Sequence, residues 1–309
     1  YRREVTPFGT AFSIRKFRED PYSIIDLINL GTLSEEMAAY FWMCLENRAS
    51  VMVLGGTAAG KTTALNALAC LIKPGSKIIT IEETAELNLP HENWVSLIAR
   101  RSYGLGENQS GEVTLFDLVK TSMRHRPDVL IVGEIRGNEA YVLFQALATG
   151  HGGMCTMHAE NIDSAVKRLT SKPMDIASTY MPLMNIVATV RRVHLPEAGE
   201  MKAYRRIVSV DEIADYEDYR NVFKWKPSED IHGSSLKKGK MLSVISEQRG
   251  YSEKELFDEI ERRRNILSWM RERNIRSYKD VAAIITEYYS RPKEFYEGEV
   301  EVVALPQHS

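Results

Sequence analysis

Short, nearly continuous apolar runs alternate along the first two thirds of the chain with segments in which apolar residues recur every three or four positions. An apolar run without polar alternation is typical of a strand buried on both faces of a parallel sheet, and the longer spacing is typical of a helix. The runs predict strands at residues 51–54, 77–81, 128–132 and 154–157. The spaced segments predict helices at residues 22–30, 64–72, 113–124, 138–149 and 162–169, with another that ends near residue 46 after a cap at Thr32 or Ser34. This alternation predicts an α/β fold with a mainly parallel sheet.

The pattern changes at residue 185. Residues 186–193 and 203–210 are rich in β-branched side chains and flank a turn-forming stretch at 196–200, which predicts a β-hairpin. Residues 224–240 are polar and basic, so we expect a surface loop there.

Two helices are expected near the end of the chain. Ser252 and Glu255 have the spacing of a capping box, which opens a helix to about Glu272. Ser277 opens a second helix, to about Tyr289. Together these helices predict a small helical appendage.

The chain begins with Tyr rather than Met, so we expect a fragment that an upstream domain precedes. Polar and apolar residues alternate around residues 12–17, which predicts a strand at the end of that preceding domain. We therefore expect three parts: an interdomain segment at 1–20, an α/β domain at 21–213 and the helical appendage at 214–309.

The composition narrows the class of protein. The 309 residues are 44% hydrophobic and 27% charged with a formal net charge of -2, which exerts no general attraction on nucleic acid or anionic lipid. Three cysteines without a Cys-x-x-Cys pair indicate a reducing compartment and no structural zinc site. The sequence contains no apolar run near the ~18 residues of a membrane span and no signal peptide.

The first apolar run leads directly into the pattern Gly-x-x-x-x-Gly-Lys-Thr, and a helix follows. Strand, glycine-rich loop and helix in this order form a P-loop, in which backbone N–H groups and the positive end of the helix dipole surround phosphate oxygens. Lys61 should reach the β- and γ-phosphates, and the Thr62 hydroxyl should bind Mg²⁺. The expected nucleotide-binding residues are Gly55, Gly56, Thr57, Ala58, Ala59, Gly60, Lys61, Thr62 and Thr63. The sequence therefore predicts a site for ATP and Mg²⁺.

Acidic residues follow two of the predicted strands, at the ends where open parallel sheets bind their ligands. The run at 128–132 leads into Gly133 and Glu134, and the glycine stands where many P-loop enzymes have Asp. Glu134 is therefore the carboxylate expected to orient or deprotonate the attacking water, or to hold Mg²⁺ through water. Glu82 and Glu83 end the strand after the P-loop and offer a second source of carboxylate for water or metal.

His158 ends the fourth predicted strand, and His151 precedes that strand. A metal site would need a third ligand nearby, so we expect none here. The strand-end position favours His158 as a sensor of the γ-phosphate or a coupler between subunits. Arg100, Arg101 and Arg136 are candidates to place positive charge beside the γ-phosphate during hydrolysis.

These elements, in this order, resemble the type II/IV secretion ATPase superfamily, which includes pilus assembly and retraction motors, secretion traffic ATPases and the archaellum motor. The resemblance covers roughly residues 8–213 and implies a RecA-like P-loop NTPase domain. Besides the Walker A loop, four segments carry the resemblance. Residues 12–17 are similar to the family's interdomain segment, and residues 81–87 are similar to its Asp box. Residues 126–136 are similar to its atypical Walker B motif, and residues 149–158 are similar to its His box.

The resemblance implies a homo-hexameric ring that turns ATP hydrolysis into domain movement against a polytopic membrane platform protein. Such a motor is cytoplasmic and peripherally associated with the cytoplasmic membrane. By position, the resemblance implies that Lys61 and Thr62 bind phosphate and Mg²⁺ and that Glu134 acts with the water. It implies that Glu82 or Glu83 supports Glu134 and that His158 senses the γ-phosphate. It also implies that Arg100 or Arg101 reaches nucleotide within or between subunits. The chain lacks the tetracysteine module of bacterial general-secretion ATPases, which makes it more similar to the archaeal branch.

Two alternatives remain open at this point. A RecA-like hexameric nucleic-acid translocase would share the P-loop, the sheet and the ring, but the near-neutral charge and the lack of a basic-aromatic stripe argue against a nucleic-acid partner. An ATP-gated assembly scaffold would bind nucleotide and barely hydrolyse it. Glu134 argues against that function, because a protein that only binds nucleotide needs no carboxylate directed at water.

Overall fold

The structure is a computed structural model that describes residues 8–14, 20–100, 111–197 and 199–291. Within these residues a single sheet runs through the molecule. Its strands are β1 (Val51–Leu54), β2 (Ile78–Glu82), β3 (Trp94–Ile98), β4 (Val129–Val132), β5 (Gly152–Met157), β6 (Ile186–Glu197), β7 (Glu200–Asp215), β8 (Asp218–Lys226) and β9 (Ile231–Ser234). Their order in the sheet is β3-β2-β4-β5-β1-β6-β7-β8-β9.

The sheet has a parallel part and an antiparallel part. From β3 across to β6 all neighbouring strands are parallel, whereas β7, β8 and β9 each run antiparallel to the strand before them. The fold is therefore mixed α/β with a large, mostly parallel sheet, as the alternating pattern predicts, and the predicted hairpin is β6 with β7.

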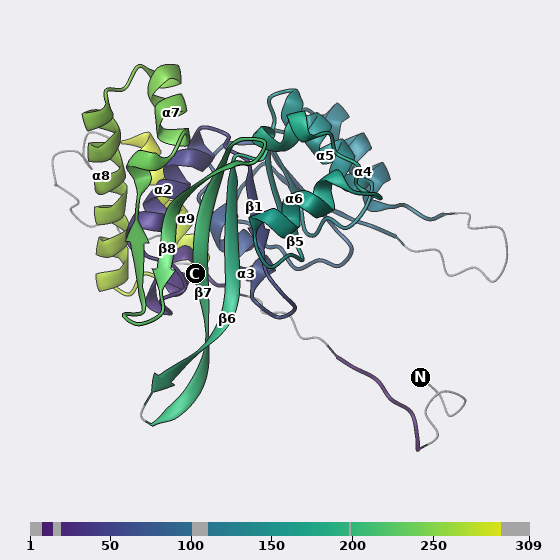
Figure 1. Ribbon diagram of the computed structural model, residues 1–309, viewed down its shortest axis with the longest axis horizontal. Helices are drawn as coiled ribbons and strands as arrows, with labels where there is room; N and C mark the ends of the chain where they lie inside the picture. Colours follow the sequence, from purple (N-terminus) through teal and green to yellow (C-terminus); the bar gives the residue numbers. More distant parts are fainter. Residues whose placement is uncertain (1–7, 15–19, 101–110, 198, 292–309) are drawn as a thin grey trace.

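Helices cover both faces of the sheet. They are α1 (Ile24–Asn29), α2 (Glu35–Glu46), α3 (Lys61–Ala69), α4 (Leu115–Ser122), α5 (Glu139–Ala148), α6 (Ile162–Thr170), α7 (Met241–Arg249), α8 (Glu253–Glu272) and α9 (Tyr278–Ser290). Figure 1 shows α2, α8 and α9 on one side of the sheet and α4, α5 and α6 on the other. No helix in the described ranges combines the length and the apolar composition that crossing a bilayer requires.

The side chains of β1 show why this strand is apolar at every position. Val51 and Val53 join an apolar cluster with α1–α3 and α7–α9, whereas Met52 and Leu54 join a second cluster with α4–α6. Successive strand residues point to opposite faces of a sheet, so a strand covered on both faces needs apolar residues throughout.

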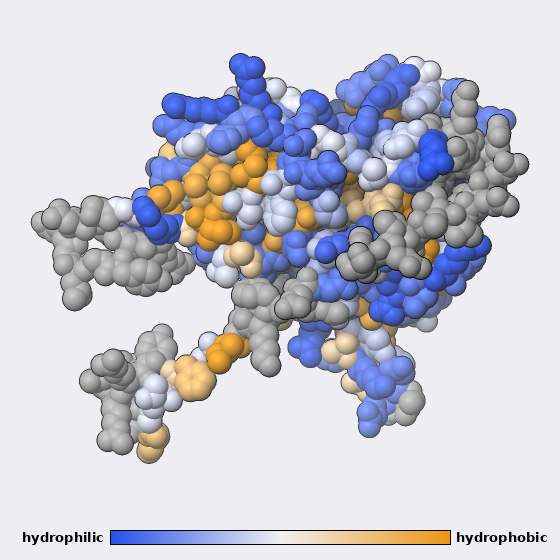
Figure 2. All heavy atoms as spheres, turned by 180° about the vertical axis from the view of Figure 1, so that it is seen from behind, coloured by the Kyte–Doolittle hydropathy of each residue, from blue (hydrophilic) through white to orange (hydrophobic). Residues whose placement is uncertain are grey.

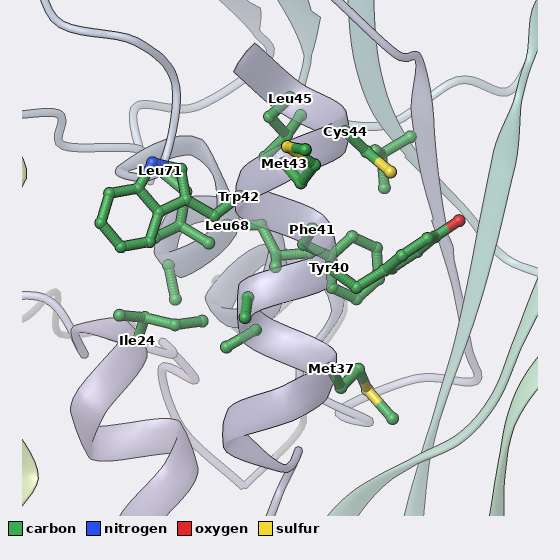
Figure 3. Close-up of a cluster of buried hydrophobic side chains, with 14 of the residues drawn as sticks. Ile24, Met37, Tyr40, Phe41, Trp42, Met43, Cys44, Leu45, Leu68 and Leu71 are labelled. Atoms are coloured by element: carbon green, nitrogen blue, oxygen red, sulfur yellow. The ribbon is translucent and has the colours of Figure 1, made fainter. Parts of the chain in front are cut away.

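Helix α2 lies in the middle of the larger cluster, and each residue from Met37 to Leu45 is buried. Figure 3 shows Tyr40 and Trp42 projecting to opposite sides of this helix. The Tyr40 hydroxyl donates to Oε1 of Glu212 on β7 at 2.7 Å, and Nε1 of Trp42 donates to the Tyr289 hydroxyl on α9 at 3.0 Å. The aromatic side chains of α2 thus connect the sheet to the C-terminal helices.

Part of the prediction for the second half of the chain is wrong. Residues 224–240, predicted as a surface loop, contain the end of β8, all of β9 and a 3₁₀-helix at Leu236–Lys238. In β8, Lys224 and Lys226 are exposed and Trp225 between them is half-buried, so this strand has one solvated face and the composition of a loop. Strand β3 and helix α7 are absent from the sequence prediction.

The segments at the two ends of the predicted α/β domain differ from the sequence prediction. Residues 12–14, part of the strand predicted at 12–17, are not in a strand, and residues 15–17 lie outside the described ranges. The predicted boundary after residue 213 falls inside β7. Helices α8 and α9 begin after Ser252 and Ser277, as the capping residues predict.

Candidate active site

The carboxyl ends of β1, β2, β4 and β5 open into one cavity of about 580 Å³. Parallel strands end at the same edge of a sheet, so residues that follow different strands meet there. The cavity is lined by residues 57–63 of the P-loop together with Glu82, Glu83, Thr84, Glu86, Gly133, Glu134, Arg136, His158 and Arg205.

The P-loop has the backbone geometry of a phosphate cradle. Gly60 has φ 97° and Ala58 has φ 58°, both in the left-handed region. A Cβ atom on Gly55 would lie 2.6 Å from the carbonyl oxygen of Val190, so no side chain fits at that position. No side chain caps the first turn of α3, so its N–H groups remain available to phosphate oxygens.

Lys61 closes back over this loop, with Nζ 3.2 Å from the carbonyl oxygen of Gly56. Burial in the cavity lowers the pKa of Lys61, while the carboxylate of Glu134 acts in the opposite direction. A half-buried ammonium group that shares the cavity with the P-loop N–H groups is suited to an anionic ligand.

Glu82 is the buried acid of the site, with 4% of its surface exposed. Burial raises its pKa to about 7, even though its carboxylate accepts hydrogen bonds from the backbone N–H groups of Glu86 and Leu87, both at 3.1 Å. Glu83, the next residue, is exposed and lines the same cavity. The two neighbouring acids are therefore in different environments.

The geometry explains why Gly133 replaces the usual Asp. A Cβ atom on Gly133 would lie 3.1 Å from Cγ of Glu82, so a longer side chain would press on that buried acid. The Gly133 carbonyl oxygen accepts a hydrogen bond of 2.7 Å from the Thr156 hydroxyl of β5, which fixes the turn. Glu134, the next residue, is therefore the residue of this turn whose carboxylate can act on water or metal.

Glu134 forms an ion pair with Arg136, whose Nη2 lies 2.6 Å from its Oε2. The hydrogen bond to Glu134 raises the pKa of Arg136. The guanidinium group and the carboxylate therefore hold each other in place in the lining of the cavity.

The structure brings most of the predicted site residues together, but not all of them. Residues 57–63, Glu82, Glu83, Glu134, Arg136 and His158 line one cavity. Arg100 lines a neighbouring cavity of about 490 Å³ that also contains Glu83, and its Nε donates to the carbonyl oxygen of Gly111 at 2.6 Å. Arg101 lies outside the described residues.

Sequence reasoning missed Arg205, which reaches the cavity from β7. Its Cδ would lie 2.8 Å from a Cβ atom on Gly60, so the arginine stem lies directly against the P-loop backbone. Arg205 belongs to the predicted hairpin, but no motif marks it; only the register of β6 and β7 reveals its position.

This set of groups fits a magnesium nucleotide. The P-loop N–H groups and Lys61 can bind phosphate oxygens, and the hydroxyl of Thr62 with the carboxylates of Glu82 and Glu134 can hold Mg²⁺ directly or through water. Mg²⁺ commonly takes one or two carboxylates and completes its shell with phosphates and water. The donor set of the cavity is of this kind.

One family profile and several known proteins are similar to this chain. The profile of the family described as type II/IV secretion system protein matches residues 5–220. The uncharacterized protein MJ0900 of Methanocaldococcus jannaschii is 40% identical over 306 residues, an alignment that covers 95% of this chain and 54% of that protein. MJ1287 of the same organism is 38% identical over 287 residues, with 89% of this chain and 99% of that protein covered.

Among solved structures, the VirB11 ATPase from the Brucella suis type IV secretion system, in complex with sulphate, is 23% identical and has a TM-score of 0.45. That comparison covers 67% of this chain and 62% of the other. The chain spans about half the length of MJ0900.

Proposed function

Because the chain belongs to the type II/IV secretion system protein family, we propose that it is an ATPase that powers protein secretion or the assembly of a pilus- or archaellum-type filament. One observation carries the proposal: a P-loop lysine, Lys61, and a strand-end acid, Glu134, face the same cavity with the buried Glu82 beside them. Phosphate-binding groups and carboxylates that line one cavity are what ATP hydrolysis requires.

The residues of the cavity divide the work of hydrolysis. The P-loop N–H groups and Lys61 hold the β- and γ-phosphates. The Thr62 hydroxyl would hold Mg²⁺ directly, and Glu134 would reach the metal only through water. When bound, Mg²⁺ neutralises the charge that develops on the phosphate oxygens. Glu134 orients the attacking water and accepts its proton, because it is the carboxylate at the end of the Walker B strand.

The remaining site residues assist this reaction. Glu82 and Glu83 support the water or the metal from the neighbouring strand. Arg136 supplies positive charge to the γ-phosphate, since it lines the cavity beside Glu134. His158 senses the γ-phosphate at the end of β5, and the arginines at 100 and 101 reach nucleotide within or between subunits.

We further propose the assembly that this function needs. The chain works as a homo-hexamer, in the cytoplasm and peripheral to the cytoplasmic membrane, on a polytopic platform protein of the secretion or filament system. Support comes from the family and from Arg100, which lies outside the main cavity and faces a neighbouring one.

The test is steady-state phosphate release from ATP, measured across protein concentrations with and without anionic lipid vesicles and with and without single-stranded DNA. The proposal expects a specific rate that rises with protein concentration and rises further with lipid. Stimulation by DNA alone, steeply reduced by salt, would instead identify a nucleic-acid translocase. ATP binding without phosphate release would identify a scaffold.

A further inference from the structure

The hairpin of β6 and β7 continues beyond the rest of the sheet. β1 ends at Leu54, which is paired with Thr189 of β6, whereas β6 runs on to Glu197 in a ladder with β7 alone. Figure 1 shows this hairpin projecting below the body of the molecule. Since β6 runs parallel to β1, the hairpin leaves the sheet at the edge where the P-loop begins.

Arg205 lies on this hairpin, next to the P-loop. It lines the nucleotide cavity, and its stem lies against Gly60. Within the described ranges its guanidinium group has no hydrogen-bond or ion-pair partner, and the residue is exposed. The adjacent Arg206 differs: it is 4% exposed, and its Nε and Nη2 each lie 2.7 Å from an Asp230 carboxylate oxygen.

A second arginine stands opposite Arg205. The register pairs Arg192 of β6 directly with Arg205 of β7, so the two side chains leave the same face of the hairpin. Like charges directly opposite each other destabilise a strand pair. In the part of the chain that the structure describes, no acidic side chain pairs with either of them. An anion beside Arg205 would offset this repulsion.

The order of the strands fixes which end of a nucleotide Arg205 meets. Glu82 ends β2 and Glu134 follows β4, and both strands lie on one side of β1, whereas β7 lies on the other side. The γ-phosphate must face the acids that act on the water. The opposite end of the nucleotide, from the α-phosphate outward, therefore faces the hairpin.

We propose that Arg205 is a nucleotide-binding residue that contacts the α-phosphate and so ties the projecting β6–β7 hairpin to the bound nucleotide. This inference rests on the proposed function, in that it takes the cavity as the ATP site. ATP and ADP share the α-phosphate, so the contact serves both nucleotides. Loss of the arginine therefore weakens binding without removing a group that acts on the water.

The experiment measures the dissociation constants of ADP and of a non-hydrolysable ATP analogue by calorimetry, with Mg²⁺ present. The variants are Arg205→Ala and, as a matched control, Arg264→Ala, whose arginine lies on α8 and pairs with Glu261 at 3.0 Å. We expect Arg205→Ala to weaken both nucleotides about tenfold, the size expected for one charge-assisted hydrogen bond, and the control to bind as the parent does. In steady-state hydrolysis KM should rise with little change in kcat.

Two results would overturn the inference: unchanged ADP binding in Arg205→Ala, or a loss confined to the ATP analogue, which would place the arginine at the γ-phosphate. A thermal midpoint of Arg205→Ala at or above that of the parent excludes misfolding as the cause. The proposed function fails separately, if the parent chain binds both nucleotides and releases no phosphate from ATP. The Arg205 contact would then still stand.

Discussion

Nη2 of Arg136 lies 2.6 Å from Oε2 of Glu134, so the carboxylate proposed to act on the attacking water is held by an arginine two residues further along the chain. Both groups face the cavity that also contains Lys61. A triphosphate in this cavity would offer the guanidinium group a second anionic partner. We infer that the arginine aligns Glu134 and completes the positive charge around the γ-phosphate.

Replacing Arg136 with alanine should therefore affect catalysis far more than stability. We expect kcat for ATP hydrolysis to fall about a hundredfold, because misplacing a reacting group by about 1 Å has that effect. The melting temperature should change little, since the Arg136 side chain is 62% exposed and such ion pairs contribute about 0–1 kcal/mol. Arg220→Ala removes a comparably exposed pair with Asp218, outside the cavity, and is the control. A variant at position 136 with the parent's kcat would refute the alignment role.

The raised pKa of Glu82 should make the free energy of unfolding depend on pH. With a folded pKa of about 7 and an unfolded value near 4.5, the carboxyl ionises in the unfolded chain first. Its contribution to stability is therefore intact below pH 4.5, is lost as the pH rises from 4.5 to 7, and is absent above that range. Glu82→Gln should then stabilise the protein relative to the parent, most at pH 8 and progressively less toward pH 5.

Urea unfolding of the parent and of Glu82→Gln at pH 5.5 and pH 8 measures this difference. Glu83→Gln, at the exposed neighbouring position, controls for the loss of one acidic group from the cavity. A stability gain of equal size at both pH values, or a loss at pH 8, would show that burial does not hold Glu82 in its neutral form.

Gly133 should not tolerate the Asp found in many other P-loop enzymes. The added side chain would start 3.1 Å from Cγ of Glu82 and bring a second carboxylate to a buried one. Overpacking of this kind typically costs about 1–3 kcal/mol, so we expect Gly133→Asp to lower the free energy of unfolding by that amount and to reduce hydrolysis. Gly133→Ala, which adds only the Cβ atom, should be milder in both measurements. An Asp variant as stable and active as the parent would remove the explanation for the glycine.

The C-terminal helices should unfold together with the rest of the chain. Arg263 of α8 is 3% exposed; it pairs with Glu46 of α2 and, at 3.0 Å, with Glu259 of its own helix. Its guanidinium group also lies 5.1 Å from the ring centroid of Trp42. Removing it would leave two largely buried carboxylates without their cation.

We expect Arg263→Leu to lower the free energy of unfolding by about 3–5 kcal/mol, in a single transition seen equally by circular dichroism and by tryptophan fluorescence. Arg264→Leu, at the neighbouring exposed position, should have little effect. Two separate transitions would instead show that the C-terminal helices unfold independently of the rest of the chain.

The sequence predicts the half of the site that follows parallel strands. Glu82, Glu134 and His158 stand at or just after the ends of nearly continuous apolar runs, and Lys61 stands at the end of the P-loop that follows another such run. These runs can be recognised in the sequence because their strands are buried on both faces. Their meeting in one cavity follows from the parallel arrangement alone. The α/β architecture is predictable for the same reason.

The antiparallel half of the sheet is harder to predict from the sequence. In β8, exposed Lys224 and Lys226 give a strand the composition of a loop, because only one of its faces is covered. Arg205 meets the P-loop only because β7 pairs with β6 in one particular register, and neither strand carries a motif that specifies it. Contacts that depend on register between distant segments are determined by packing of the whole fold, and no local pattern contains them.

The central claim is that Glu134 directs water at ATP in this cavity, and phosphate release by the parent and by Glu134→Gln tests it most directly. Equilibrium binding of ATP to the same samples distinguishes loss of chemistry from loss of the substrate. We expect Glu134→Gln to bind ATP as tightly as the parent and to release phosphate at least about a hundredfold more slowly. Phosphate release by Glu134→Gln at the parent's rate would contradict the claim.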